Sequence, residues 1–93
     1  MRLPTTFPLG RLLATPGALE AMAESGLIPA HILARHSCGD WGLVDEEDQR
    51  LNDESLRDGS RLLSAYETQL GVRLYVITEA DRSATTILRA DEY

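Results

Sequence analysis

The sequence has no lysine, a single cysteine and no long apolar run. One cysteine, Cys38, cannot form an intrachain disulfide, which excludes a small secreted fold held together by disulfides. No apolar stretch approaches the roughly 20 residues that cross a membrane, and the first ten residues contain none long enough for a signal peptide. We therefore expect the protein to be in the cytoplasm of a bacterium-like cell and not to bind a membrane.

Negative charge is concentrated in one segment of the chain. The net charge is −6, and residues 40–58 alone contribute −6, whereas residues 1–39 contribute +1 and residues 59–93 contribute −1. The acids of this segment are Asp40, Asp45, Glu46, Glu47, Asp48, Asp53, Glu54 and Asp58. Binding to a nucleic-acid backbone needs Lys and Arg, so we expect no direct nucleic-acid binding. The expected partner is a protein with a basic surface.

Three helices are expected in the first part of the chain. Thr15 and Pro16 predict a helix start, because Thr caps free amides and Pro suits the first helical position; Gly26 predicts its end. A second helix is expected from Pro29 to about residue 37. Asp45 predicts the cap of a third, mostly polar helix that runs to about residue 57 and closes at residues 58–59.

The periodicity changes from helical to alternating after residue 60. Segments 61–67, 72–78 and 84–89 are predicted strands, and their short connections require an antiparallel three-stranded meander. A short additional strand is allowed between Phe7 and about residue 14. We expect segment 84–89 to be an exposed edge of the sheet, which makes a homodimer a reasonable expectation.

The predicted fold class is α+β. Three N-terminal helices pack on one face of a small antiparallel sheet, in a single domain over residues 1–93 with residues 1–8 irregular. The buried face of the sheet is expected to lie against the first two helices and to consist of Val72, Leu74, Val76 and Leu88. The apolar stripe expected on the first helix is Leu19, Met22 and Ala23.

Several long motifs carry a resemblance to a known group of proteins. They are Gly-Asp-Trp-Gly at 39–42, Glu-Glu-Asp at 46–48 and Ile-Thr-Glu-Ala-Asp-Arg-Ser at 77–83, followed by Thr85-Thr86. With these motifs the chain resembles a family of small bacterial proteins of unknown function that belong to plasmids, phages and integrated elements. It departs from that pattern at Arg89-Ala90, where an apolar residue followed by Pro is usual. The resemblance implies a shared fold and a mobile-element setting, and no activity.

The leading functional hypothesis is a non-catalytic module that binds another protein and needs no cofactor. One version is an inhibitor of a host defence complex, an anti-CRISPR candidate, that masks a basic nucleic-acid channel. The residues expected to bind the partner are Asp40, Trp41, Glu46, Glu47, Asp53, Glu54, Asp81 and Arg82. Two of them have other interpretations. Trp41, between two glycines, also suits the end of a small core, and Arg82 is expected to pair with Glu79.

Two alternatives belong to other functional classes. The first is a small metal-dependent hydrolase or nuclease that uses His36, Asp40, Glu79 and Asp81. Against it, His36 near a helix end is also expected to pack on the apolar face and bond free carbonyls. Cys38 lies in acidic surroundings, which disfavour a reactive thiolate. The second alternative is a regulatory subunit that works only within a larger assembly.

Overall fold

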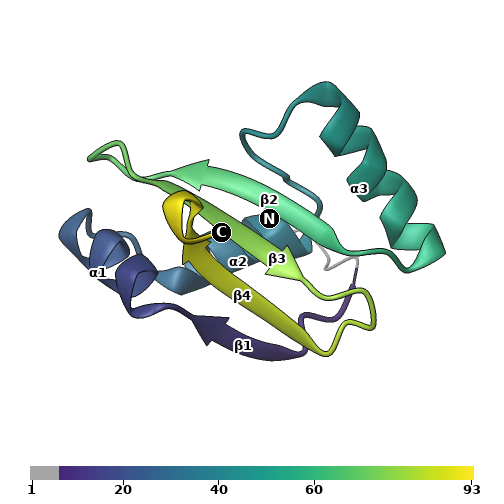
Figure 1. Cartoon of the computed structure of the whole chain (residues 1–93), viewed down its shortest axis with the longest axis horizontal. Helices are drawn as coiled ribbons and strands as arrows, with labels where there is room; N and C mark the ends of the chain where they lie inside the picture. Colours follow the sequence, from purple (N-terminus) through teal and green to yellow (C-terminus); the bar gives the residue numbers. More distant parts are fainter. Residues whose placement is uncertain (1–6) are drawn as a thin grey trace.

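The computed structural model describes residues 7–93 of the chain, so most of the stretch expected to be irregular lies outside the described residues. Three helices precede a C-terminal meander of strands, which confirms the α+β class (Figure 1). The elements, in chain order, are β1 (Arg11–Ala14), α1 (Pro16–Glu24), α2 (Pro29–Ser37), α3 (Glu46–Asp58), β2 (Leu62–Glu67), β3 (Arg73–Thr78), β4 (Ala84–Arg89) and the short 3₁₀ helix η1 (Ala90–Glu92).

The predicted helix boundaries are confirmed by their caps. The Thr15 side chain accepts a hydrogen bond from the Ala18 amide, and Pro16 occupies the first turn of α1. The Asp45 side chain accepts from the Asp48 amide at the start of α3. Gly59 ends α3 in the left-handed conformation, with φ of 81°, and its amide donates to the Ser55 carbonyl.

The sheet has four strands in the order β1-β4-β3-β2. The antiparallel meander β2-β3-β4 and the additional N-terminal strand are both confirmed. β1 runs parallel to β4, which makes the sheet mixed. The expectation that segment 84–89 forms an edge is wrong, because β1 covers β4 on that side.

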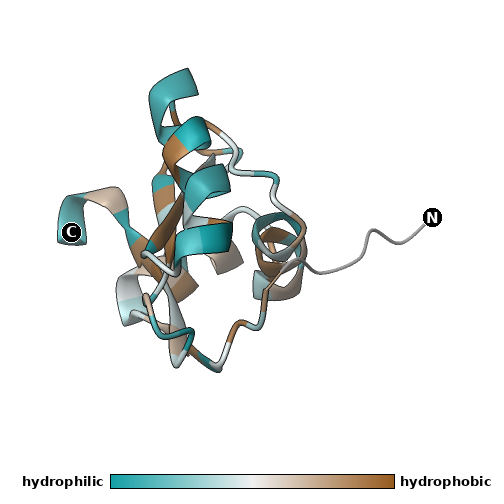
Figure 2. Ribbon diagram, turned by 90° about the vertical axis from the view of Figure 1, so that its right-hand side faces the viewer, coloured by the Kyte–Doolittle hydropathy of each residue, from teal (hydrophilic) through white to brown (hydrophobic). Residues whose placement is uncertain are grey.

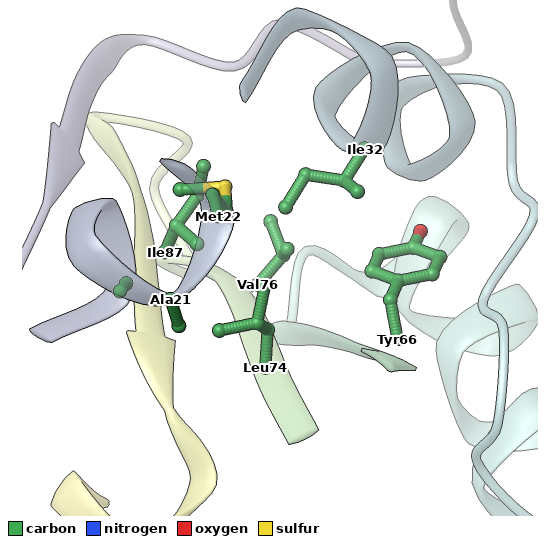
Figure 3. Packing of buried hydrophobic residues seen from close by; sticks show 8 residues of the cluster. Ala21, Met22, Ile32, Tyr66, Leu74, Val76 and Ile87 are labelled. Carbon is green, nitrogen blue, oxygen red and sulfur yellow. The ribbon is translucent and has the colours of Figure 1, made fainter. Parts of the chain in front are cut away.

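One layer of the fold consists of α1 and α2, which pack against one face of the sheet. Their buried contact residues meet Leu74, Val76 and Ile87 of the strands (Figure 3). Ile87 replaces the expected Leu88, whose side chain points to the opposite face because strand residues alternate. On α1 the buried residues are Ala18, Ala21 and Met22, so the expectation is confirmed for Met22 and wrong for Leu19, which is 47% exposed, and for Ala23, which is also exposed.

The third helix lies along β2 at the end of the sheet (Figure 1). Viewed from the side of this helix, most of its length is hydrophilic (Figure 2). It docks through an amide: Asn52 Nδ2 donates to the Leu63 carbonyl at 2.7 Å, and the Leu63 amide donates to Asn52 Oδ1 at 3.1 Å. Residues 41–43 form a parallel bridge to the next position, Ala65, through two further main-chain bonds. Together these contacts satisfy the outward main-chain groups of Leu63 and Ala65 on β2.

Replacing Asn52 with alanine should lower the free energy of unfolding by about 2 kcal/mol, because both main-chain groups of Leu63 lose their partner. Asn52→Asp should be no better, since its second carboxylate oxygen would face the Leu63 carbonyl. Urea unfolding measures both changes. Ser55→Ala is the matched control on the same helix face. Its hydroxyl bonds only to the Leu51 carbonyl within α3, so it should cost less than about 1 kcal/mol. Equal losses for Asn52→Ala and Ser55→Ala would show that Asn52 does not hold the edge.

Candidate functional site

The candidate site is the outward side of α3, where most of the negative charge lies. Glu46 and Glu47 are exposed in the first turn, next to Asp45 and Asp48. Four consecutive carboxylates at a helix N-terminus are favoured by the helix dipole. Two turns further along the same side lie Asp53, which is exposed, and Glu54, which accepts from Arg50 at 3.2 Å.

The Gly39–Gly42 turn is joined to α3 through Trp41. Its indole Nε1 donates to Asp53 Oδ1 at 3.0 Å. The ring is only 4% exposed and packs with Phe7 and Leu62 in a second apolar cluster. Trp41 is thus a core residue that positions the turn, which is one of its two expected roles, and Asp53 holds its indole.

Asp40 forms an ion pair with Arg35, whose Nε lies 2.7 Å from Asp40 Oδ2. The hydrogen bond from Arg35 is the main reason why the pKa of Asp40 is lowered and that of Arg35 raised. The Arg35 guanidinium also lies 4.6 Å from the centre of the Tyr66 ring. The Tyr66 hydroxyl donates to the Asp40 carbonyl at 2.6 Å, and burial raises the pKa of Tyr66 to about 12. The Asp40 carboxylate is therefore held in place by Arg35 and remains partly exposed.

The turn before β4 is joined to the C-terminal end of α3 through Arg82. Its guanidinium donates to four main-chain carbonyls, those of Ser55, Ser60, Glu79 and Ala80, at 2.6–3.2 Å. These bonds hold Arg82 at φ of 61°, a conformation that side chains other than glycine rarely adopt. The expected pairing with the Glu79 carboxylate is wrong, since Arg82 bonds the carbonyl of that residue instead.

Asp81, in the same turn, is exposed and accepts a hydrogen bond from the Ser83 amide at 3.0 Å. Hydrogen bonds from the Ser83 side chain and amide lower the pKa of Asp81. The structure thus joins both the Gly39–Gly42 turn and the turn that contains Asp81 to α3, through Asp53 and the Ser55 carbonyl. Of the eight residues expected to bind the partner, Trp41 and Arg82 instead hold the fold together.

His36 is fully buried and lies in a chain of hydroxyl groups. Its Nδ1 is 2.5 Å from Ser64 Oγ, its Nε2 is 2.8 Å from Thr78 Oγ1, and Thr78 Oγ1 is 2.7 Å from Thr85 Oγ1. Thr85 Oγ1 donates to the Leu9 carbonyl. The expectation that His36 bonds free carbonyls is therefore wrong, because its two partners are side-chain hydroxyls.

The Leu9 carbonyl fixes which group donates and which accepts in each of these hydrogen bonds, because a carbonyl can only accept. The Thr85 hydroxyl donates to it, so Thr78 must donate to Thr85, and His36 Nε2–H must donate to Thr78. His36 therefore carries a proton on Nε2. Because its pKa is lowered to about 4, the ring is neutral at pH 7, and its Nδ1 accepts from the Ser64 hydroxyl. Burial, assisted by the positive charge of Arg82, lowers the pKa of His36 to about 4.

The structure does not assemble the proposed hydrolase site. Within residues 7–93, no three side chains of the His, Cys, Asp or Glu type are arranged to hold a metal ion. Both ring nitrogens of His36 are already bonded to hydroxyls, while Asp40, Glu79 and Asp81 are exposed. The four residues of that hypothesis therefore remain separate.

A shallow groove lined by both polar and apolar side chains borders the acidic first turn of α3. It has a volume of about 270 Å³, with Leu63 and Tyr75 of the sheet on one side and Val44 and Asp48 on the other. A neighbouring hollow of about 230 Å³ shares Asp48 and Leu63 and extends to Leu51 on α3. The carboxylates thus adjoin apolar surface, a combination that suits contact with another protein.

Sequence reasoning did not find the residues that hold this arrangement. Asn52 and Arg35 lie in positions that the sequence alone assigns to ordinary polar surface. The three hydroxyls in the hydrogen-bond chain that starts at His36 come from three different strands. The available signal was the presence of Ser and Thr at inward positions of the predicted strands, where buried polar groups need partners.

The chain matches no family model, no curated protein and no solved structure in comparisons with known proteins. Among residues 7–93, no helix is both long enough and apolar enough to cross a membrane.

Proposed function

We propose that the chain is a small, acidic, non-catalytic module of the cytoplasm that binds a basic surface of another protein through α3. The observation that carries the proposal is the rigid presentation of the carboxylates. Asn52 fixes the middle of α3 to β2, Asp53 bonds the buried Trp41, and Arg82 bonds the Ser55 carbonyl near the helix end. A surface that is ordered before binding loses less conformational entropy in the complex.

The spacing of the acids supports a repeating array of charge. Glu46 and Asp53, and likewise Glu47 and Glu54, are seven residues apart, which places each pair on one side of the helix at about 10 Å along its axis. A specific version of the proposal is that this array covers a basic nucleic-acid channel of a host defence complex. The resemblance of the motifs to proteins of plasmids and phages supports that version.

The test is a reversal of charge that spares the structural carboxylates. Asp53 holds the Trp41 indole and Glu54 pairs with Arg50, so we choose Glu46→Lys/Glu47→Lys, at two exposed positions. The partner is identified by affinity capture from cells that carry the gene, and its affinity is then measured by titration calorimetry at several salt concentrations. The variant should bind at least about tenfold more weakly, and wild-type binding should weaken as salt rises.

The matched control is Glu20→Lys/Glu24→Lys on α1, which changes the net charge by the same amount at exposed positions away from α3. It should bind within about twofold of wild type. Thermal unfolding of both variants checks the fold, because lysine at a helix N-terminus is itself unfavourable by up to about 1 kcal/mol per residue. Equal affinities of the α3 variant and wild type would exclude α3 as the contact surface.

A further inference from the structure

The two edges of the sheet differ in their hydrogen bonding. On β2, the main-chain groups of Leu63 and Ala65 that point away from the sheet are bonded by Asn52 and by residues 41–43. On β1, the described residues supply no such partners, and Leu12 and Leu13 are 54% and 41% exposed. Unpaired strand edges bind other strands readily, so within residues 7–93 β1 offers an edge that is open to another strand.

The pairing with β4 identifies which groups of β1 are free. The Arg11 amide donates to the Ser83 carbonyl and the Thr15 amide donates to the Ile87 carbonyl. Bonding residues alternate along a strand, so Leu13 also faces β4. The amides and carbonyls of Leu12 and Ala14 therefore point outward.

We infer that a second copy of this chain pairs with β1 in an antiparallel manner, about a two-fold axis at Leu13. This inference goes beyond the proposed function of α3. In this register Leu12 of each copy lies opposite Ala14 of the other, and four hydrogen bonds satisfy every outward group of both strands. The two Leu13 side chains meet across the axis, and the sheets join into one of eight strands.

Charge complementarity favours a second copy as the occupant. The same register places Arg11 opposite Thr15 of the other copy, on one face of the joined sheet. The Thr15 hydroxyl donates to Glu92 Oε1 at 2.8 Å, so each pairing brings the Arg11 guanidinium next to the Glu92 carboxylate of the other copy. Among residues 7–93, Arg11 has no carboxylate within ion-pair distance in the monomer.

The acidic helices do not oppose this association. α3 lies along β2, at the far end of the strand order from β1. Each α3 is thus separated from the dimer axis by the width of the sheet, three strand spacings or about 14 Å. The joined molecule presents one acidic helix at each end.

The first test measures mass by sedimentation velocity from low micromolar to millimolar concentration. Wild type should sediment as a dimer at the upper end of this range. Leu12→Pro should be monomeric and folded, because the Leu12 amide points outward and is not used by β4. In a Cys38→Ser background, Leu13→Cys should form an intermolecular disulfide on oxidation, whereas Arg11→Cys should not, since only residue 13 meets its own copy.

The second test swaps charges. Arg11→Glu and Glu92→Arg should each weaken the dimer roughly tenfold, because both place like charges at the two symmetric contacts. An equimolar mixture of the two variants should form the heterodimer selectively, since each contact then joins opposite charges; native mass spectrometry distinguishes it from the homodimers. Circular dichroism checks that Glu92→Arg, whose wild-type carboxylate also bonds the Arg89 amide, keeps its fold.

Three results would overturn the inference: a wild-type chain that stays monomeric at millimolar concentration, a dimer that persists in Leu12→Pro, or a random mixture of charge-swapped variants. None of these bears on partner capture by α3, which Glu46→Lys/Glu47→Lys tests separately.

Discussion

The free energy of unfolding should fall by roughly 3 kcal/mol as the pH is lowered from 6.5 to about 4. Burial holds the pKa of His36 at about 4 in the folded chain, against 6.5 when it is exposed. In this window the unfolded chain binds a proton that the folded chain excludes, so stability decreases as the pH falls, by about 1.4 kcal/mol for each pKa unit. Urea unfolding at a series of pH values measures the loss.

Above pH 5 the carboxylates contribute little to this loss, because the pKa of an unfolded Asp is 3.8 and hydrogen bonds lower the folded pKa values of Asp40, Asp58 and Asp81 below that value. His36→Gln should therefore be less stable at neutral pH and nearly independent of pH between 5 and 6.5. His31→Gln is the matched control on the exposed side of the same helix and should keep the wild-type slope. An unchanged slope in His36→Gln would mean that His36 is not the group responsible.

The chain of hydroxyls around His36 also explains why this residue belongs to the fold. It joins α2 to β2 and β3, and through Thr85 to the segment before β1. A buried polar group without a partner costs about 1–3 kcal/mol, so each member of the chain depends on its neighbours. Both ring nitrogens of His36 are bonded to hydroxyls, so neither is free to bind a metal ion or to activate water.

The local structure could largely be predicted from the sequence. Caps and turn residues act within a few positions, so Thr15, Asp45 and Gly59 identify the ends of α1 and α3. The alternation after residue 60 identifies the meander for the same reason. These signals do not depend on how distant segments meet.

The faces and edges of the sheet could not be predicted in the same way. In β4, Thr85 and Ile87 point toward the helices, while Thr86 and Leu88 point away. Each set contains one Thr and one aliphatic residue, so alternation alone does not identify the buried face. The position of β1 beside β4 depends on contacts more than 70 residues apart in sequence, such as Leu12 with Thr85.

For the candidate site, the sequence identified the charges and missed their supports. Glu46, Glu47 and Asp81 are exposed as expected from a solvated surface. Trp41 and Arg82 instead join α3 to the rest of the fold. The sequence alone does not tell whether a Trp or an Arg in a turn contacts a partner or the rest of the protein. Here the contacts of Trp41 with Asp53 and of Arg82 with Ser55 show the second role.

The Gly-Asp-Trp-Gly turn meets β2 most closely at Gly42. A Cβ atom at this position would lie 2.0 Å from the Ala65 carbonyl oxygen and 2.8 Å from the Tyr66 ring. The backbone here has φ of 71°, and its neighbours make the main-chain bonds that bridge residues 41–43 to Ala65. A glycine is required both by the conformation and by the contact.

Gly42→Ala should therefore lower the free energy of unfolding by about 3 kcal/mol or more, since the left-handed backbone conformation alone accounts for about 1–2 kcal/mol and the collision with a main-chain carbonyl adds to it. Gly59→Ala is the matched control, with φ of 81° and no atom within 4 Å of the added Cβ. It should lose only the stability that the left-handed backbone conformation costs an alanine. Because the turn must move away from β2, the Ala65 amide should also exchange its hydrogen faster in Gly42→Ala than in Gly59→Ala, which NMR detects. Similar losses of stability in the two variants would mean that the close approach at Gly42 does not hold the turn on the sheet.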